Sequence, residues 1–278
     1  MRIQAKIILP VLICLFAAGE VRAQFTAAEV AERTGWEDFL KTAEIVHWEE
    51  IGEGVTKPLR LTLRKDGREA RGVWKNPSGH QLGFLEGWQY EIAAYEVDKL
   101  LGLGMIPPTV EREFQGRRGS LQLWVTVKHS LLKVMEERIP IPETAREATD
   151  RMKYIVRAFD SLIANDDRTQ QNLLYTEDWR TIAIDHSRAF RSTRQHVRRL
   201  LYGRNGIKSA DDGRPHLFRR LPRTMVEAVR ALDLPKLEKA VGPLLTKAEI
   251  DAVLARRKLL LEEIELMIRE QGEENVLY

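Results

Sequence analysis

Alternating apolar and polar positions predict strands in the first half of the chain. Residues 60–63 (Arg-Leu-Thr-Leu) alternate with the period of a half-buried strand, and residues 70–74 form a matching segment after Asp66-Gly67. An Asp-Gly pair between two such segments is a strong signal for a β-hairpin. Residues 45–48 and 121–125 are further predicted strands.

Helical periodicity dominates the second half. The pattern predicts helices over residues 86–101, closed by Gly102, and over residues 143–164. From Met225 onward the chain reads as helical, and a capping box at Thr246 opens a last helix that ends near Gly272. Strands with one helix therefore come first and a mostly helical part follows. This order predicts an α+β fold, divided into residues 24–128 and 129–278.

The first 23 residues have the layout of a secretory signal peptide. Arg2 and Lys6 precede an apolar run over residues 7–19, and Ala23 completes a small-residue cleavage site. We expect an exported protein, periplasmic or extracellular, that begins near Gln24; the alternative is an uncleaved N-terminal anchor. No other segment approaches ~18 uninterrupted apolar residues, so we expect no membrane span after cleavage.

Composition excludes several classes of protein. The only cysteine, Cys14, lies in the predicted signal, which excludes cysteine nucleophiles, zinc-cysteine sites and redox chemistry in the mature chain. The net charge is +3, and removing three basic and one acidic residue with the signal leaves +1. Such a balance gives no sign of a nucleic-acid partner. The histidines show no metal or triad spacing, and the motifs of serine hydrolases and zinc proteases do not occur.

The chemistry is concentrated around two short strands. Asp167 precedes Asn172 by five positions, and Asp185 follows the second strand. The strands, residues 173–175 and 182–184, predict a hairpin that brings Asn172 and Asp185 together. Phosphoryl transfer needs such a set: a carboxylate that orients the attacking hydroxyl, and oxygen ligands that hold magnesium on the phosphates. The alternative interpretation is a turn with an Asx cap.

The same residues carry a resemblance to known enzymes. Asp167-Arg168-x-x-x-Asn172, followed by Ile184-Asp185-His186-Ser187-x-x-Phe190, resembles the Asp-Arg-His-x-x-Asn and Asp-Phe-Gly motifs of phosphoinositide-kinase-like enzymes. It is also similar to HipA-type kinases and to the secreted Golgi casein kinase family. The resemblance covers residues 48–190 and departs at Thr169 and at His186-Ser187. It implies a two-lobed kinase-like fold, with ATP and Mg²⁺ or Mn²⁺ as cofactors.

The resemblance also implies roles for individual residues. Asp167 would be the base or hydroxyl-orienting group, and Asn172 and Asp185 the metal ligands. Lys75, at the end of the predicted return strand, would neutralise phosphate charge, and Glu91 in the next helix would position it. Without the resemblance, Lys75 would be interpreted as a surface lysine at the end of a strand. Glu91 would lie on a solvated helix face, and Glu86 and Glu96 are alternative candidates for the partner of Lys75.

Two backbone segments complete the predicted nucleotide site. Gly52 and Gly54 lie between the first two strands, where a glycine loop lets backbone N–H groups approach phosphates; an ordinary hairpin is the alternative. Residues 121–125 would lead to the hinge that holds the adenine, with Trp124 interpreted as a core residue.

These observations predict an exported phosphotransferase that moves the terminal phosphoryl group of ATP to a hydroxyl of a protein, sugar or lipid head group. The alternatives are an inactive kinase-like binding protein and AMP transfer on the same scaffold. Residues 188–223 contain eleven basic residues against two acidic ones. We therefore hypothesise an acidic acceptor, because arginine binds carboxylates and phosphates through bidentate contacts. The alternative is a solvated face, or pairing with Glu262, Glu263 and Glu265 of the last helix.

Overall fold

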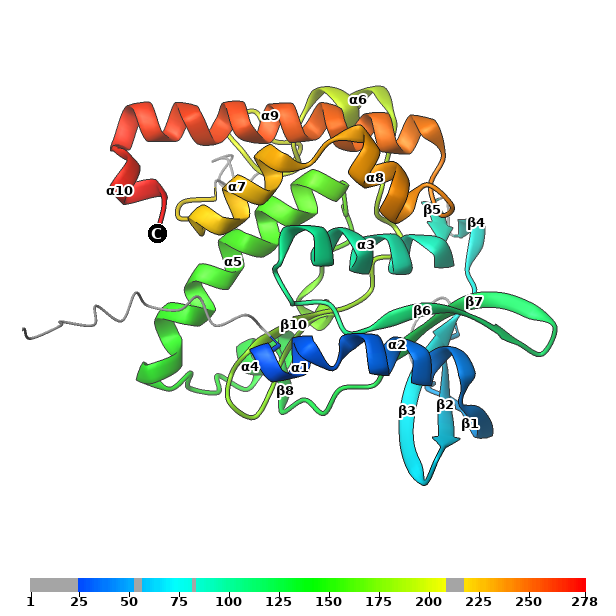
Figure 1. Cartoon of the computed structure of the whole chain (residues 1–278). Coiled ribbons are helices and arrows are strands. Elements are labelled where there is room, and N and C mark those ends of the chain that lie inside the picture. The colour runs from blue at the N-terminus through cyan, green and yellow to red at the C-terminus, as the bar shows by residue number, and fades with distance from the viewer. Residues whose placement is uncertain (1–24, 53–56, 82–83, 209–217) are drawn as a thin grey trace, which may run out of the picture.

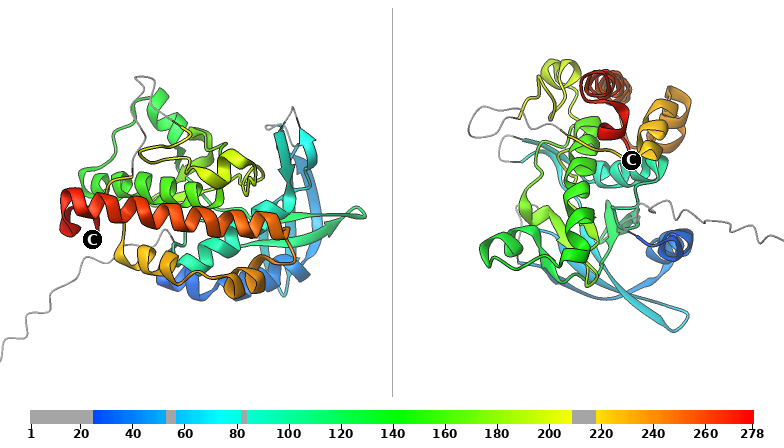
Figure 2. Two further views of the ribbon diagram at one scale, coloured as in Figure 1. Left: turned by 90° about the horizontal axis from the view of Figure 1, so that it is seen from above. Right: turned by 90° about the vertical axis from the view of Figure 1, so that its left-hand side faces the viewer.

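The computed structural model describes residues 25–52, 57–81, 84–208 and 218–278 (Figure 1). A sheet lies at one end of the molecule and most helices at the other, with α3 (Trp88–Leu101) between them (Figures 1 and 2). The predicted signal peptide and Gly54 lie outside the described residues, so both stay predictions.

The N-terminal lobe contains an antiparallel sheet with the order β1-β2-β3-β7-β6, which the described residues form from five strands. The strands are β1 (Glu44–Glu50), β2 (Leu59–Lys65), β3 (Arg68–Lys75), β6 (Thr109–Phe114) and β7 (Arg117–Leu123). Asp66 and Gly67 form the predicted turn between β2 and β3, with φ values of 50° and 77°. A type I′ turn requires positive φ at both positions, which Asp-Gly tolerates. The predicted hairpin is therefore confirmed.

Helix α2 (Arg33–Thr42) covers one face of this sheet. Its Phe39 packs with Trp74 of β3 in an apolar cluster that includes the three buried leucines of β2. A short helix, α1 (Ala27–Ala31), precedes it and opens with a capping box between Thr26 and Glu29. Side chains alternate along a strand, so Lys75, next to Trp74, points to the opposite face. That face meets α3 and the helical lobe.

The chain from β3 to α3 departs from the prediction. We expected the helix to begin at Glu86, but Glu86 lies in β5 (Phe84–Gly87), which pairs with β4 (Ser78–Gln81). Gly87 has the extended backbone of an N-cap, and the helix starts at Trp88. Strand pairing thus overrides the helical pattern at Glu86. The C-terminal end agrees with the prediction, because Gly102 closes the helix with a φ of 64°.

A second, small sheet lies where the lobes join. It has the order β10-β9-β8, from β8 (His129–Ser130), β9 (Leu173–Tyr175) and β10 (Thr181–Ala183). The predicted hairpin is confirmed, except that its second strand begins and ends one residue earlier than expected. Ile184 follows β10, and its N–H donates to the carbonyl of Asn172 over 3.1 Å. Asn172 and Asp185 therefore leave the hairpin side by side.

The remaining described residues form the helical lobe. Helices α5 (Glu143–Ile163) and α9 (Lys247–Gln271) pack together, and α3 belongs to the same apolar core. Figure 2 shows α9 running along the outside of this lobe. The capping box at Thr246 is present. The lobe also contains α4 (Leu131–Glu136), a short 3-10 helix (Gln170–Asn172), α6 (Arg194–Arg198), α7 (Arg223–Ala231), α8 (Leu234–Val241) and α10 (Glu273–Val276).

Candidate active site

Three charged side chains from three elements meet between the lobes. Lys75 is the last residue of β3, Glu91 lies in the first turn of α3, and Asp185 follows β10. The Nζ atom of Lys75 lies 2.8 Å from Glu91 Oε1 and 2.8 Å from Asp185 Oδ1. The structure thus brings together three of the predicted site residues. It places Glu91 against Lys75, whereas Glu86 pairs with Arg188 and Glu96 with Lys99.

Burial strengthens this ion pair. The side chains of Lys75 and Glu91 are 15% and 3% exposed. Burial alone would lower the pKa of Lys75, but the charges of Asp185 and Glu91 outweigh it and raise that pKa. Burial would likewise raise the pKa of Glu91, but Lys75 and His186 hold it well below its usual range. Both groups are therefore charged at neutral pH, as a site for phosphates and metal requires.

Glu91 also fixes the segment that carries Asp185. Its second oxygen, Oε2, accepts a hydrogen bond of 2.9 Å from the backbone N–H of His186. Asp185 itself has a φ of 61°, a conformation that L-residues rarely adopt outside constrained sites. The His186 side chain is fully buried, and burial together with the Arg168 charge lowers its pKa. His186 is therefore a neutral structural residue, which supports the turn rather than taking part in chemistry.

Arg168 ties the loop of Asp167 to the strand that ends at Asp185. Its side chain is 5% exposed and forms a two-pronged contact with the buried Asp160, at 3.0 and 3.1 Å. Its Nη1 donates to the carbonyls of Asn172 and Ile184, at 3.1 and 2.7 Å. Arginine provides several donors in a rigid fork, which suits such a junction. The clamp holds both predicted metal ligands at fixed positions.

Asp167 lies beside Arg188 and pairs with it. Its Oδ2 atom lies 3.2 Å from Nη1 of Arg188, which follows Asp185 by three positions. Burial raises the pKa of Asp167, and the charge of Arg188 opposes this shift. The side chain is 38% exposed, so a hydroxyl group from solvent can reach it. A carboxylate with a raised pKa in a cleft is a candidate proton acceptor.

Asn172 and Asp185 have the chemistry of a site for a hard divalent cation. The amide nitrogen of Asn172 donates to the Asp167 carbonyl at 3.4 Å, which leaves its amide oxygen available as a ligand. Asp185 is 37% exposed and uses Oδ1 for Lys75. Within the described chain, no cluster of three or more acidic, histidine or cysteine side chains would enclose a cation. The donor set fits Mg²⁺ or Mn²⁺, which nucleotide phosphates and water would complete.

The predicted nucleotide-binding backbone is described only in part. Gly52 follows β1 with a φ of 76°, in the left-handed region that glycine adopts without strain. The connection over residues 124–128 leaves Val125 and Val127 without backbone hydrogen bonds to other described residues. Such groups suit recognition of a planar base. Trp124 differs from the prediction: it is 38% exposed beneath the Arg60 guanidinium, because it follows the buried end of β7.

Four residues of this site make contacts that the sequence did not predict. Asp160 and Arg168 form the buried clamp, and Glu86 and Arg188 form a second pair beside Asp167. Asp160 left a signal, because it is an acidic residue inside the apolar stretch of α5, where a lone charge needs a partner. Glu86 left none, because its position depends on the β4–β5 hairpin.

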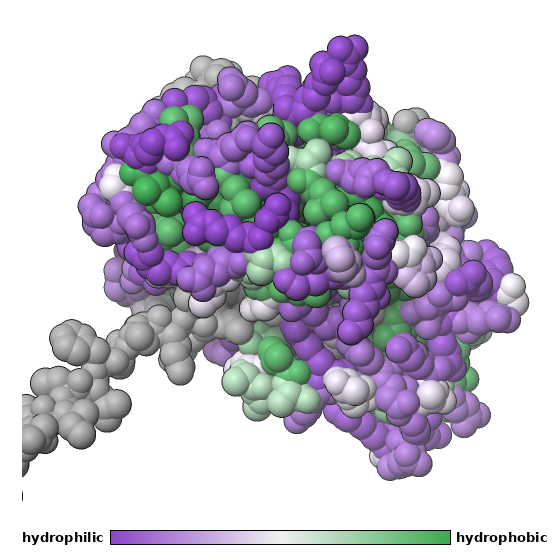
Figure 3. Space-filling view, turned by 45° about the horizontal axis from the view of Figure 1, so that its top comes forward, coloured by the Kyte–Doolittle hydropathy of each residue, from purple (hydrophilic) through white to green (hydrophobic). Residues whose placement is uncertain are grey.

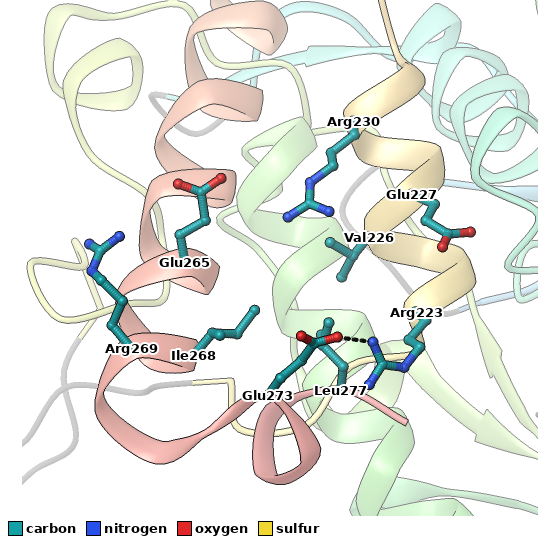
Figure 4. Close-up of a pocket in the computed structure, with 9 residues that line it drawn as sticks. All are labelled: Arg223, Val226, Glu227, Arg230, Glu265, Ile268, Arg269, Glu273 and Leu277. Atoms are coloured by element: carbon teal, nitrogen blue, oxygen red, sulfur yellow. Dashed lines mark hydrogen bonds and ion pairs between the residues drawn. The ribbon is translucent and has the colours of Figure 1, made fainter.

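A separate hollow within the described residues lies away from this site. It measures about 470 Å³ and lies between α7, α9 and the C-terminal segment (Figure 4). Its three arginines match its three glutamates, and Arg223 pairs with Glu273, so it offers no net charge to a nucleotide. On the face shown in the space-filling view, hydrophobic patches are interrupted by hydrophilic side chains (Figure 3). We therefore place the candidate site at Lys75.

Comparisons with known proteins agree with this geometry. No protein-family model and no curated protein sequence matches the chain. Among solved structures, hydra Fam20 with sugar aligns over 93% of this chain and 95% of its own, with a TM-score of 0.61 and 17% identity. The Golgi casein kinase, also solved with Mn/ADP bound, aligns over 89% and 79%, with a TM-score of 0.60 and 16% identity.

A bacterial protein has a similar structure. The Helicobacter pylori proinflammatory kinase CtkA aligns over 84% of this chain and 97% of its own, with a TM-score of 0.55 and 13% identity. Likeness at such identities concerns the fold. The chain therefore has the two-lobed α+β fold of the atypical kinase-like proteins, as the sequence predicted.

Proposed function

We propose that this protein is a metal-dependent phosphotransferase, which moves the terminal phosphoryl group of ATP to a hydroxyl acceptor. One observation carries the proposal: Lys75 lies between Glu91 and Asp185, 2.8 Å from each, at the junction of two kinase-like lobes. This is the arrangement that kinases need to hold phosphates and metal. The structural neighbour with Mn/ADP bound supports it.

The step that follows is a direct transfer. The acceptor oxygen attacks the terminal phosphorus, and an O–P bond forms as the bond to the bridging oxygen of ADP breaks. Asp167 takes the proton of the acceptor hydroxyl, and ADP leaves. Lys75 binds phosphate oxygens, held by Glu91, while Gly52 and Gly54 belong to the loop over the phosphates. Asn172 and Asp185 would hold Mg²⁺ or Mn²⁺, which neutralises phosphate charge when bound.

The acceptor in this proposal carries negative charge. Of the eleven basic residues over 188–223, Arg204 and Arg223 form ion pairs with Glu270 and Glu273, which are not the glutamates named in the alternative, so part of the stretch has a structural role. Arg194 and Arg198 are exposed and have no ion pair with another described residue. A hollow of about 290 Å³, lined in part by Arg191, Ser192 and Thr193, lies beside them. An acidic acceptor would find both charge and space there.

Export belongs to the proposal as well. No helix within the described part of the chain is long and apolar enough to cross a membrane. Processing of residues 1–23 would release the protein to the periplasm or to the medium. N-terminal sequencing of the native protein should then find Gln24 or a close neighbour, and an intact Met1 on native protein purified from the cytoplasm would contradict export.

Intact-mass measurement tests the activity. The full mature chain is incubated with ATP, Mn²⁺ or Mg²⁺ and a panel of acceptors: an acidic serine peptide, a phosphorylated sugar, a neutral sugar and a lipid head group. A phosphoryl adduct on one acceptor supports the proposal. An AMP adduct, which has a different mass, would contradict phosphoryl transfer and identify nucleotidyl transfer instead. Nucleotide binding without any adduct would identify a kinase-like binding protein.

A further inference from the structure

Arg188 occupies the place between Asp167 and the buried Glu86. Its Nε and Nη2 atoms face Glu86 Oε1 at 2.8 and 2.7 Å, and its Nη1 lies 3.2 Å from Asp167 Oδ2. The ring of Phe84 lies beneath the guanidinium, 4.7 Å away. The side chain is only 15% exposed. Arg188 is therefore held in one position by contacts from the β4–β5 hairpin and the Asp167 loop.

The β4–β5 hairpin is itself fixed to the segment that carries Arg188. The Gly87 N–H donates to the Ser187 carbonyl over 2.9 Å, and Ser187 Oγ lies 3.4 Å from Glu86 Oε2. Glu86 is 2% exposed, so its carboxylate needs a cation close by. This support leaves Arg188 little freedom except at the end that faces Asp167.

The guanidinium retains donors for a further ligand. It carries five N–H groups, and the three contacts to Glu86 and Asp167 use three of them. The other two have no acceptor among the described residues. Any hydroxyl that Asp167 orients must lie within hydrogen-bond distance of its carboxylate, and the phosphorus under attack lies next to that hydroxyl. A phosphoryl group there is within reach of Arg188.

The charges of the cleft point the same way. Asp167, Asp185, Glu86 and Glu91 surround it, whereas Lys75 and Arg188 are the cations in contact with them. Lys75 is held on the side of Glu91 and Asp185. A terminal phosphoryl that approaches Asp167 adds negative charge where Arg188 is the neighbouring cation. Fixed donors aimed at developing charge are a large source of catalysis.

We infer that Arg188 is a further catalytic residue, which binds the terminal phosphoryl group of the nucleotide and stabilises it during transfer. This inference rests on the proposed function. Glu86 acts as its positioning residue. Arg188 exchanges its contact with Asp167 for the phosphoryl oxygens, and Asp167 is then free to receive the acceptor proton.

Comparing two nucleotides tests this role without depending on the acceptor. Affinities for ADP and for a non-hydrolysable ATP analogue are measured by calorimetry with Mn²⁺. Arg188→Gln should weaken the affinity for the ATP analogue by at least about tenfold, as expected for a lost charged hydrogen bond. It should weaken the affinity for ADP by less than about threefold. Transfer should fall by about 10³-fold. Arg64→Gln is the control, because Arg64 pairs with Glu69 beside the β2–β3 turn, at the opposite end of this hairpin from Lys75.

Removal of Arg188 alone leaves Glu86 buried and unpaired, which can destabilise the fold. The double variant Glu86→Gln with Arg188→Gln removes both charges, and it should fold and keep the selective loss of the ATP analogue. If the ratio of ADP affinity to ATP-analogue affinity is the same in the parent and in this double variant, the role of Arg188 is overturned and the proposed function is not. A parent that binds neither nucleotide with metal would instead overturn the proposed function, and this inference with it.

Discussion

The two sides of the cleft are built differently. On the side that we propose for the phosphates, Lys75 and Glu91 are nearly buried and pair directly, and Glu91 also binds the backbone beside Asp185. On the side that we propose for the acceptor, Asp167 is 38% exposed and its partner Arg188 is supported by the β4–β5 strand pair. The first side has a fixed geometry, which suits a ligand that does not vary, the nucleotide phosphates. The second is more exposed and lies beside a basic surface, where we propose that a particular acceptor is selected.

The largest effect should come from the proton acceptor on the second side. Asp167→Asn keeps the size of the side chain but removes the charge, and it should lower turnover by 10²–10⁴-fold, roughly the contribution of a general base. Single-turnover transfer to the acceptor found by mass measurement gives the rate. Asp166→Asn is the matched control, because the Asp166 carboxylate faces Arg191 and His196, at 3.6 and 3.7 Å, rather than Arg188. If Asp166→Asn loses more activity, the base is assigned to the wrong aspartate.

The free energy of unfolding should show how much the buried Asp160–Arg168 pair stabilises the fold. Arg168→Gln leaves Asp160 buried without its cation, and removing one partner of a buried pair costs about 3–5 kcal/mol. Urea unfolding gives the free energy. The control Arg204→Gln breaks an exposed pair with Glu270 and should cost less than about 1 kcal/mol. Equal costs for the two variants would mean that Arg168 does not hold the site together.

The pH dependence tests the state of Asp167. Burial raises the pKa of this carboxyl above its usual value of 3.8. The ionised form accepts the proton, so kcat/KM for ATP should fall as pH falls through that raised pKa, by about tenfold per pH unit. The activity that remains in Asp167→Asn should lack this acid limb. An identical limb in parent and variant would assign it to another group.

The smallest effect concerns the acceptor surface. Arg194→Glu reverses an exposed charge in α6 and should raise the acceptor KM about two- to fivefold, in the range of exposed ion pairs, with nucleotide affinity unchanged. Added salt should raise KM in the parent through screening. Arg230→Glu makes the same charge change on α7 and should leave KM as it was. Equal effects of the two reversals would leave the basic stretch without a role in recognition.

The same contrast explains what the sequence could predict. The order of elements, the Asp66-Gly67 hairpin and the end of α3 at Gly102 follow from local patterns, and the structure has them. Lys75, Glu91 and Asp185 were found because their types and order along the chain match a known chemistry. Their contact depends on strand pairing and helix packing, which the structure supplies.

The acceptor side could not be predicted in this way. Glu86 was assigned to a helix, but it lies in β5, which pairs with the preceding strand β4. Its contact with Arg188 joins residues 102 positions apart. No local periodicity records such a pairing, because it depends on how an inserted hairpin meets the segment after Asp185. The sequence shows how many arginines lie over residues 188–223, but their partners are known only from the structure.

The most direct test of the central claim is metal-dependent nucleotide binding at Asp185. The melting temperature of the full mature chain is measured with ADP, with Mn²⁺, and with both, since a ligand that binds the native state raises the apparent stability. We predict that ADP with Mn²⁺ raises the melting temperature of the parent and of Asp167→Asn more than either ligand alone does, and that Asp185→Asn loses this increase. A parent that shows no joint effect, or an Asp185→Asn variant that keeps it in full, would contradict the account.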